Sequence, residues 1–429
     1  MRFGTDGIRG HYPEEISEDL AYALGRAVAS VLGGTVVVGS DTRASSPSLV
    51  RAVLAGLSDG GATGVNLGVL PTPGVAVIAQ RRGCAGVVVS ASHNPFHDNG
   101  LKVLGVGGAK LDPEVEPDLE AALDRFIHTA PSEFLDVAVD RSAAEEYRAH
   151  LTGLVSADLA GLHVVLDCAN GAASLVAPAV FTDAGASVSV LHASPDGRNI
   201  NAECGSTHPE SLAEAVMTHG ADIGLAFDGD ADRLICVDAS GRVRDGDDLM
   251  VLFALDFHER AEHDAGVVVT LMSNLGLRRA LGSAGVPLVE VAVGDRNVAL
   301  ALDERNWPFG GEQSGHLIFR DLAPTGDGLL TGLLVCELVR RRGELGALAD
   351  AAWHRVPQVL VNVARDDYDE AATQAIFDEA RERHHVADDD VRLLIRLSGT
   401  EPVVRVMIEA LNAEFVDDVA GRLRTRYGL

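Results

Sequence analysis

The sequence predicts a multidomain α/β protein that ends in a smaller α+β domain. Short Val-rich runs alternate with amphipathic stretches at the spacing typical of α/β folds. The chain has 429 residues, and since domains usually hold ~100 to 200 residues, roughly three or four domains are expected. The C-terminal segment differs, because its strand-like runs have helical stretches beside them, which favours α+β organisation.

Each predicted element follows from its local pattern. Val-rich runs predict strands at 35–38, 86–89, 163–166, 223–227, 267–270 and 288–293, and in the C-terminal segment at 359–363, 391–397 and 403–409. Amphipathic stretches predict helices at 19–32, 48–58, 210–218 and 275–284. Ser46 followed by Pro47 is typical of an N-cap with proline at the first helical position, which supports the second helix.

The same patterns place domain boundaries near residues 140, 240 and 354. The predicted domains are 1–140, 141–240, 241–353 and 354–429. Residues 133–145 and 351–357 are the best linker candidates, although either could be an ordinary surface helix.

Composition excludes several classes of protein. No apolar run of ~18 residues is present to cross a bilayer, and the formal net charge of -28 argues against nucleic acid or an anionic membrane as partner. Thr5, Asp6 and Arg9 stand where a signal peptide would need an apolar region. The five cysteines form no CxxC pair, so buried thiols in a reducing cytoplasm are expected.

A serine motif follows the strand predicted at 86–89. Residues 90–95 read SASHNP, so Ser92 is expected to be exposed at the carboxyl end of the strand, where ligands gather in open α/β sheets. His93 and Asn94 supply donors that could steady a phosphate, and Pro95 stops the turn from continuing as a helix. A polar turn without chemistry is the alternative. No serine lies in a GxSxG motif.

An acidic motif follows the strand predicted at 223–227. Asp228, Asp230 and Asp232 alternate along a turn, where three carboxylates can converge on one hard cation such as Mg²⁺, with water and a phosphate oxygen completing its shell. An EF-hand is excluded, because Arg233 stands where that loop needs glycine and Ala239 where it needs glutamate. A solvated acidic turn is the alternative.

Two further motifs are suited to recognition. Residues 310–316 (GGEQSGH) present Glu312 and Ser314, which suit sugar hydroxyls, although a simple strand-joining turn has the same pattern. Residues 396–402 (RLSGTEP) form a Gly-containing loop whose hydroxyls, amides and guanidinium make a small phosphate cradle, with an Arg-rich sheet edge as the alternative. The cradle comprises Arg396, Ser398, Gly399 and Thr400, with Arg405 beside it. Lys110 lies in no Walker A motif, so ATP binding is not indicated.

The ordered set of motifs, together with FGTDGIRG at 3–10, resembles the α-D-phosphohexomutases over essentially the whole chain. The resemblance implies three similar α/β domains with mixed sheets and a smaller C-terminal α+β domain around a central cleft. It implies a phosphoserine at Ser92, whose phosphate touches a Mg²⁺ held by Asp228, Asp230 and Asp232. It implies that residues 310–316 bind the sugar and residues 396–402 the non-reacting phosphate.

The resemblance also implies roles for several cations near these motifs. Arg9 supports the phosphoserine, Lys102 is the candidate general acid or base, and His316 lies near the sugar. Local cations are required because a sugar phosphate is itself an anion in a strongly acidic protein. The candidates for that cluster are Arg9, Lys102, Arg233, Arg396 and Arg405.

Several segments resemble the phosphoglucosamine mutase branch of the family: 167–174 (DCANGAAS), 199–210 (NINAECGSTHPE), 270–277 (TLMSNLGL) and above all Gln313. This branch interconverts glucosamine 6-phosphate and glucosamine 1-phosphate through a phosphoserine and a 1,6-bisphosphate, which also serves as activator. The resemblance implies a hexosamine phosphate as ligand and a monomer or homodimer.

Leu397 and Asn297 depart from the branch pattern, where Lys and Tyr are usual, as do residues 41–47 and the stretch after Lys102. Two alternatives therefore stay open. One is a sister mutase for glucose or mannose phosphates. The other is a catalytically silent sugar-phosphate sensor.

Overall fold

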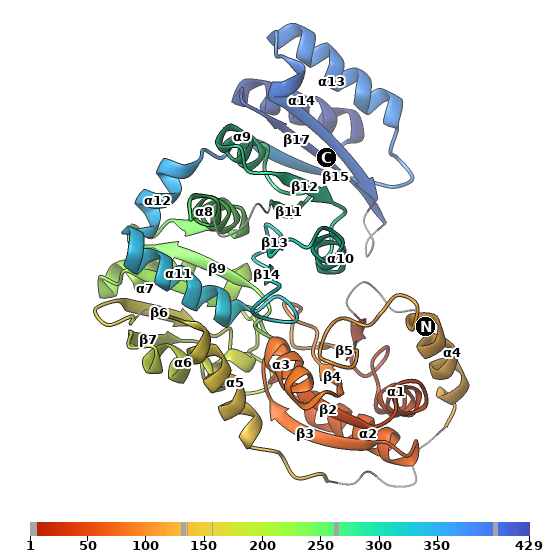
Figure 1. Cartoon of the computed structure of the whole chain (residues 1–429). Coiled ribbons are helices and arrows are strands. Elements are labelled where there is room, and N and C mark those ends of the chain that lie inside the picture. The colour runs from red at the N-terminus through yellow and green to blue at the C-terminus, as the bar shows by residue number, and fades with distance from the viewer. Residues whose placement is uncertain (1–6, 130–133, 135, 157, 261–265, 398–401) are drawn as a thin grey trace.

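The computed structural model describes residues 7–129, 134, 136–156, 158–260, 266–397 and 402–429. These residues form four separate β-sheets that follow one another around an arc, so that the first and fourth lie at its two ends (Figure 1). The predicted fold class, an α/β architecture of several domains with mixed sheets, is confirmed. The boundaries near 140, 240 and 354 remain a prediction.

The first sheet is mixed and has the order β1-β5-β4-β2-β3. Its strands are β1 (Ile8–His11), β2 (Thr35–Ser40), β3 (Thr63–Val69), β4 (Ala85–Val89) and β5 (Asp98–Leu104), and its helices are α1 (Glu18–Val31), α2 (Ser46–Asp59), α3 (Thr72–Arg82) and α4 (Glu116–Phe126). Helices α1 and α2 touch at Gly25 and Gly56, where an added Cβ would lie 2.2 Å from Val53 O and 2.1 Å from Tyr22 O. Only glycine allows so close an approach.

The predicted N-cap of α2 is wrong by one residue. Ser45 occupies the cap position without making a side-chain cap, and Ser46 is the first helical residue. The Ser46 hydroxyl instead donates to Asp41 Oδ1 at 2.9 Å. The buried Asp41 carboxylate, next to the start of α2, therefore competes with the free N–H groups of the helix for the Ser46 hydroxyl.

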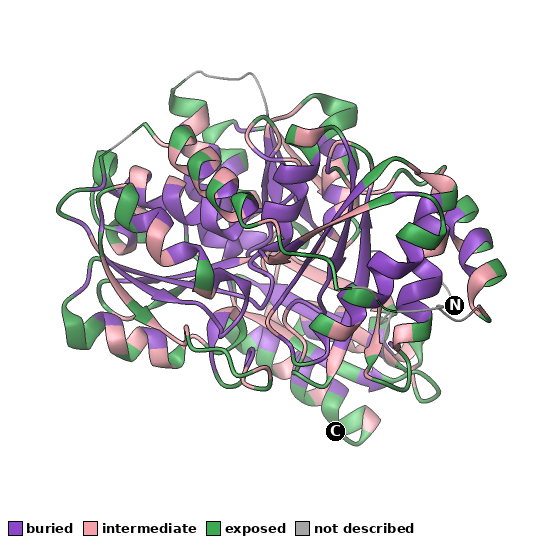
Figure 2. Cartoon of the chain, turned by 90° about the horizontal axis from the view of Figure 1, so that it is seen from below, coloured by how far each residue is buried: buried purple, intermediate pink, exposed green. Residues whose placement is uncertain are grey.

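The second sheet has the order β10-β9-β8-β6-β7. Its elements are α5 (Ser142–Leu154), β6 (His163–Asp167), η1 (Ala172–Leu175), α6 (Ala177–Asp183), β7 (Ser187–Leu191), η2 (Gly205–Thr207), α7 (Glu210–His219), β8 (Ile223–Phe227), β9 (Leu234–Asp238) and β10 (Val243–Arg244). Strands β7, β6 and β8 are parallel, so their carboxyl ends lie on the same edge. Strands β8 and β9 are buried throughout and β6 almost so, whereas β7 is exposed or half-buried. Figure 2 shows that buried residues fill the interior of the molecule and exposed residues lie at its periphery.

The third sheet has the order β12-β11-β13-β14. Its elements are α8 (Gly246–Glu259), β11 (Val267–Thr270), α9 (Leu275–Ala284), β12 (Leu288–Val291), α10 (Asp295–Arg305), β13 (Phe309–Gly311), β14 (Leu317–Phe319), α11 (Gly328–Arg342) and α12 (Leu345–Ala352). Helix α11 packs on the second sheet, since a Cβ at Gly332 would lie 2.9 Å from Phe181 and 3.1 Å from Leu225. Sequence periodicity does not reveal such packing between domains.

The fourth sheet is antiparallel, with the order β15-β17-β16. Its elements are β15 (Gln358–Ala364), α13 (Glu370–His384), η3 (Asp388–Asp390), β16 (Val391–Leu397), β17 (Val403–Ala410) and α14 (Ala413–Tyr427). Arg392 joins it to the third domain, donating to Glu290 at 3.0 Å and to the buried Glu409 at 2.6 Å. Glu409 in turn accepts from Leu275 N at 3.1 Å.

The strands predicted at 223–227, 267–270 and 391–397 and the helix at 275–284 coincide with β8, β11, β16 and α9. All five cysteines are free and buried thiols, as expected. In the described part of the chain, no helix has both the length and the apolar character needed to span a membrane.

Candidate active site

The turn after β4 places Ser92 in a buried position, which corrects the expectation that it is exposed. Ser92 is 1% exposed and has a φ of 52°, in the left-handed region that non-glycine residues rarely adopt. Its carbonyl oxygen accepts from Arg43 Nη2 at 3.0 Å and from Asn201 Nδ2 at 2.9 Å. Asn201 belongs to the second domain, so the neighbouring domain covers the serine.

Arg43 stabilises the turn after β4 that carries Ser92. Its guanidinium is buried and pairs with Asp41 at 2.9 Å, and it donates to the carbonyl oxygens of Ser92 and Asn94 at 3.0 and 2.8 Å. Asp41 also accepts from Ser90 Oγ at 2.6 Å, and Ser90 Oγ accepts from Ser92 N at 2.9 Å. This network holds Ser92 in its strained backbone conformation.

The Ser92 hydroxyl joins the first domain to the second. Its Oγ donates to Asp228 Oδ2 at 2.5 Å and lies 3.3 Å from His93 Nδ1. The two predicted motifs at 90–95 and 228–233 therefore meet in space.

The three predicted aspartates follow β8 and are buried. Asp228, Asp230 and Asp232 are at most 3% exposed, so they do not form a solvated acidic turn. One carboxylate oxygen from each lies within 4.8 Å of the others. Among the described residues, Asp230 Oδ1 and Asp232 Oδ1 have no hydrogen-bond partner. Buried carboxylate oxygens without partners fit a hard divalent cation such as Mg²⁺.

The electrostatics of the cluster also favour the binding of a cation. Burial, reinforced by Asp232 and Asp230, raises the pKa of Asp228 well above its usual value. Burial and Asp232 raise the pKa of Asp230. Burial would likewise raise the pKa of Asp232, but His316 and Lys102 outweigh it and hold that pKa well below its usual value. A bound cation would stabilise all three charges.

Protein cations lie around the cluster. Lys102 Nζ, from β5, is 3.9 Å from Asp230 and 3.6 Å from Asp232, and Arg233 Nε is 3.8 Å from Asp232. Burial alone would lower the pKa of Arg233, but Asp232 and Asp228 outweigh it and raise the pKa. Arg9, on β1, lies opposite Gly100 of β5, and its charge lowers the pKa of Asp230.

His316 lies between two carboxylates. Its Nδ1 is 3.6 Å from Asp232 and its Nε2 is 3.6 Å from Asp295. Burial alone would lower the pKa of His316, but Asp232 and Asp295 raise it to about 9. Asp295 also pairs with Lys110 of the first domain. The two carboxylates therefore favour the protonated imidazole, which lies where the first and third domains meet.

The loop at 310–316 is only partly buried at its tip. Glu312 Oε1 accepts from Gly294 N at 3.0 Å, and Gln313 donates to Asp247 at 3.1 Å. Ser314 Oγ has no hydrogen-bond partner among the described residues. This loop therefore offers a carboxylate and a hydroxyl to a ligand.

Arg396 of β16 and Arg405 of β17 are cross-strand partners in the fourth sheet. Burial and then the charge of Arg405 lower the pKa of Arg396, while Glu312 across the domain junction acts to raise it. Two like charges held side by side indicate an anion site. The predicted cradle residues Ser398, Gly399 and Thr400 lie outside the described residues.

Several residues of this region were not predicted from sequence: Asp41, Arg43, Thr72, Asn201 and Asp295. Thr72 donates to Asp230 Oδ2 at 2.6 Å. The nearest sequence signal for Thr72 is its position in LPTPG, three residues after the carboxyl end of β3 and at the first residue of α3. Asp295 lies in VGDRNV, a segment in which only Asn297 stood out from the sequence. Its contact with His316 depends on tertiary packing.

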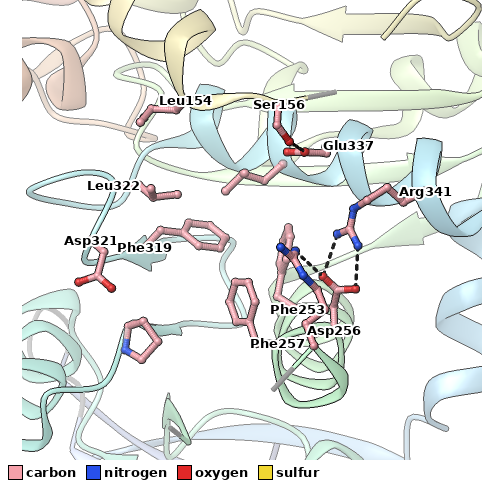
Figure 3. A pocket seen from close by; sticks show the side chains of 13 residues that line it. Leu154, Ser156, Phe253, Asp256, Phe257, Phe319, Asp321, Leu322, Glu337 and Arg341 are labelled. Atoms are coloured by element: carbon pink, nitrogen blue, oxygen red, sulfur yellow. Dashed lines mark hydrogen bonds and ion pairs between the residues drawn. The ribbon is translucent and has the colours of Figure 1, made fainter. Parts of the chain in front are cut away.

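A separate cavity of about 280 Å³ lies between α5, α8, α11 and β14 (Figure 3). Phe253, Phe257 and Phe319 form its apolar side. At its edge Asp256 accepts from Arg341 at 2.8 Å and from Arg342 at 2.7 Å. None of its lining residues belongs to the polar motifs, so the cavity is distinct from the aspartate cluster.

Comparisons with known proteins agree with this arrangement. Phosphoglucomutase/phosphomannomutase models match residues 1–127 (α/β/α domain I), 145–241 (α/β/α domain II), 245–356 (α/β/α domain III) and 360–426 (C-terminal domain). Phosphoglucosamine mutase of Rhodococcus jostii is 47% identical, covering 98% of both chains. Phosphoglucosamine mutase of Moorella thermoacetica is 45% identical, covering 100% of this chain and 99% of its own.

A solved structure shares the architecture. The phosphoglucomutase/phosphomannomutase family protein of Burkholderia thailandensis superimposes with a TM-score of 0.79 at 27% identity, covering 98% of this chain and 96% of its own.

Proposed function

Because the chain belongs to the phosphoglucomutase/phosphomannomutase family, the α-D-phosphohexomutases, we propose that it acts as a phosphoglucosamine mutase. It interconverts glucosamine 6-phosphate and glucosamine 1-phosphate through a phosphoserine at Ser92 and a 1,6-bisphosphate intermediate. Relatives named phosphoglucosamine mutase, 44–47% identical over almost the whole chain, support this choice of sugar.

The observation that carries the proposed reaction is the contact between Ser92 and the aspartate cluster. Ser92 Oγ is 2.5 Å from Asp228 Oδ2, and the aspartates stand beside Lys102, Arg233 and His316. A hydroxyl at the meeting point of a cation site and three protein cations is suited to carry a phosphoryl group.

The proposed reaction has two transfer steps. In the first, the bond between phosphorus and Ser92 Oγ breaks and a bond forms to the free hydroxyl of the sugar monophosphate. The proton of that hydroxyl ends on Ser92 Oγ, with Lys102 as the candidate that relays it. After the bisphosphate turns over, the reverse transfer from its other end rephosphorylates Ser92 and releases the isomer.

Asp228, Asp230 and Asp232, with the phosphate on Ser92, are the proposed ligands of Mg²⁺. When bound, Mg²⁺ supplies positive charge for the transferring oxygens. On the protein side, Arg9 and His93 support the phosphoserine. Lys102 and the protonated His316 add further positive charge around the reacting phosphate.

Recognition belongs to the third and fourth domains in this proposal. Glu312 and Ser314 bind the sugar, with Arg233 beside them. Arg396, Ser398, Gly399, Thr400 and Arg405 hold the phosphate that does not react. Arg392 and Glu409 of the fourth domain contact Glu290 and Leu275 N of the third. Closure of the fourth domain over the substrate would exclude water from the transfer.

We further propose that the enzyme works in the cytoplasm as a monomer or homodimer. Glucosamine 1,6-bisphosphate or glucose 1,6-bisphosphate activates it by phosphorylating Ser92. Its product, glucosamine 1-phosphate, supplies UDP-N-acetylglucosamine synthesis.

A substrate panel tests the proposed function. Purified protein, activated with glucose 1,6-bisphosphate and Mg²⁺, is assayed with glucosamine, glucose and mannose 6-phosphates. The highest kcat/KM is expected for glucosamine 6-phosphate. A higher value for glucose or mannose phosphate would establish the sister-mutase alternative, which the departures at Leu397 and Asn297 leave open. Absence of turnover on all three would establish the sensor alternative.

A further inference from the structure

A second group of potential metal ligands lies in the second domain, apart from the aspartate cluster. Asp167 ends β6, His192 follows β7, and Cys204 precedes η2. Because β6 and β7 are parallel neighbours, their carboxyl ends bring Asp167 and His192 together. One ligand atom of each of the three residues lies within 4.8 Å of the others.

We propose that Asp167, His192 and Cys204 form a second metal site, for Zn²⁺. A carboxylate, an imidazole and a thiolate are the protein ligands that Zn²⁺ prefers, and three of them leave a fourth position for water. A thiolate ligand selects a transition-metal ion over Mg²⁺. The oxygen-only aspartate cluster has the opposite preference, so the two sites would take different ions from the same solution.

The geometry of Asp167 and His192 supports their binding to the same metal ion. His192 Nδ1 lies 3.1 Å from Asp167 Oδ2, yet this buried nitrogen has no hydrogen-bond partner among the described residues. This contact with Asp167 raises the pKa of His192, so the imidazole releases a proton to solvent when its Nδ1 binds a metal ion. Ligand atoms of a tetrahedral Zn²⁺ lie about 3.3 to 3.8 Å apart, given bonds of about 2.0 to 2.3 Å. Side-chain movements of about 1 Å are enough to complete such a site.

The protein already fixes the carboxylate. Asp167 Oδ1 accepts from Ala169 N at 2.9 Å, and Oδ2 accepts from Gly205 N at 2.9 Å. Each carboxylate oxygen can accept twice, so Oδ2 retains capacity for a metal ion. These hydrogen bonds from backbone N–H groups orient the Asp167 carboxylate, as hydrogen bonds to the ligands do in known metal sites.

The other two ligands provide the thiolate and access from solvent. Cys204 is fully buried, whereas the His192 side chain is 31% exposed, which leaves an entry path. Burial, and next the charge of Asp167, raise the pKa of the Cys204 thiol to about 12. When the Zn–S bond forms, the S–H bond breaks and its proton passes to solvent.

The segment that carries Cys204 also reaches the catalytic serine. Asn201 donates to the carbonyl oxygens of Ser92 and Asn94 at 2.9 and 3.1 Å, and Asn201 N donates to Ala169 O at 2.9 Å. Zn²⁺ held by His192 and Cys204 would clamp this segment on both sides of Asn201. The expected consequence is a higher thermal midpoint of the Zn²⁺-loaded protein.

Co²⁺ titration of the full chain in excess Mg²⁺ tests the site, because Co²⁺ bound to a thiolate gives a near-ultraviolet charge-transfer band. One equivalent of Co²⁺ is expected to produce the band, and Zn²⁺ is expected to abolish it by displacement. Cys204→Ala is expected to remove the band. His192→Gln, at a half-exposed position that should not affect folding, is expected to weaken Co²⁺ binding at least ~100-fold.

Cys84→Ala and His208→Gln are the matched controls, since neither residue belongs to the group. Both are expected to retain the band and the affinity. Absence of a band in the wild-type protein would overturn the proposal. Its persistence in folded Cys204→Ala, or unchanged affinity in His192→Gln, would do the same. None of these readouts depends on mutase activity, so the test is independent of the proposed function.

Discussion

The part of the active site built by the first two domains differs from the part built by the last two. Ser92 and the three aspartates are buried, and Ser92 already contacts Asp228. Glu312, Ser314, Arg396 and Arg405 are only partly buried, and they come from a loop tip and a sheet edge. The difference indicates that the groups proposed for phosphoryl transfer are preorganised, whereas those proposed for substrate recognition are arranged to close on a ligand.

The largest effect on activity should follow from replacing Ser92, the proposed phosphoryl carrier. Ser92→Ala is expected to lower kcat by about three orders of magnitude or more, because the covalent intermediate is lost. Sugar-phosphate binding, measured by calorimetry, should persist because the last two domains remain intact. Ser48→Ala, which removes a half-buried hydroxyl outside the site, is the control. Near-normal turnover of Ser92→Ala with bisphosphate supplied would contradict the role of Ser92.

A second effect concerns the cation site. Asp230→Asn removes one of three anionic ligands, so kcat should fall by about two orders of magnitude and the Mg²⁺ concentration for half-maximal activity should rise. Asp118→Asn, on the exposed face of α4, should change neither. An unchanged Mg²⁺ requirement in Asp230→Asn would show that the cluster does not bind the activating ion.

The third prediction concerns Asp327, a buried carboxyl group, and the pH dependence of the free energy of unfolding. Asp327 is the N-cap of α11, accepting from Leu330 N at 2.9 Å and from the Tyr147 hydroxyl at 2.8 Å, and burial raises its pKa to about 6. The unfolded chain loses this proton near pH 3.9, before the native protein does. The free energy of unfolding therefore falls as pH rises from about 4 to 6, by about 3 kcal/mol from this group.

Asp327→Asn should remove that contribution, so its thermal midpoint should rise relative to wild type at pH 7.5 but not at pH 4. The Asn side chain retains an oxygen to cap Leu330 N. The same difference between the two proteins at both pH values would contradict a raised pKa.

The fourth prediction concerns the fourth domain. Arg396→Ala should raise KM by about 10- to 100-fold with a smaller effect on kcat, since a charged hydrogen bond to the non-reacting phosphate is worth about 1.5 to 3 kcal/mol. Arg365→Ala, an exposed arginine of the same domain, is the control. A fall in kcat with no change in KM would place Arg396 among the groups of the transfer step instead.

The smallest expected effect is on sugar discrimination. A carboxylate favours the protonated 2-amino group over the neutral hydroxyl of glucose, so Glu312→Gln should reduce kcat/KM for glucosamine phosphate up to ~10-fold more than for glucose phosphate. Glu304→Gln, an exposed residue of α10, should leave the ratio unchanged. An equal loss for both sugars would mean that Glu312 binds hydroxyls that the two sugars share.

The preorganised part of the site was the easier to anticipate from sequence. Asp228, Asp230 and Asp232 follow the short apolar run at 223–227, whose bounds as a strand were predicted correctly, and a strand end fixes where such residues lie. The burial of Ser92 could not be anticipated, because its cover comes from Asn201, more than a hundred positions later. Local patterns carry no information about such contacts.

Positions that serve the site through packing were missed for the same reason. Asp295 pairs with Lys110 and lies near His316, so its role depends on how the first and third domains meet. Helix α11 was not predicted from the sequence, and only the structure shows that it covers the second sheet. Strand β3 (TGVNLGV) was missed because glycine and asparagine weaken the strand pattern.

A single-turnover experiment tests the central claim that Ser92 is a preorganised phosphoryl carrier. Protein labelled with ³²P by labelled glucose 1,6-bisphosphate is mixed with unlabelled glucosamine 6-phosphate and quenched at successive times. Peptide mapping is expected to locate the initial label on Ser92, and the label is expected to pass to the sugar at least as fast as steady-state turnover. A label on another residue, or transfer slower than turnover, would contradict the account.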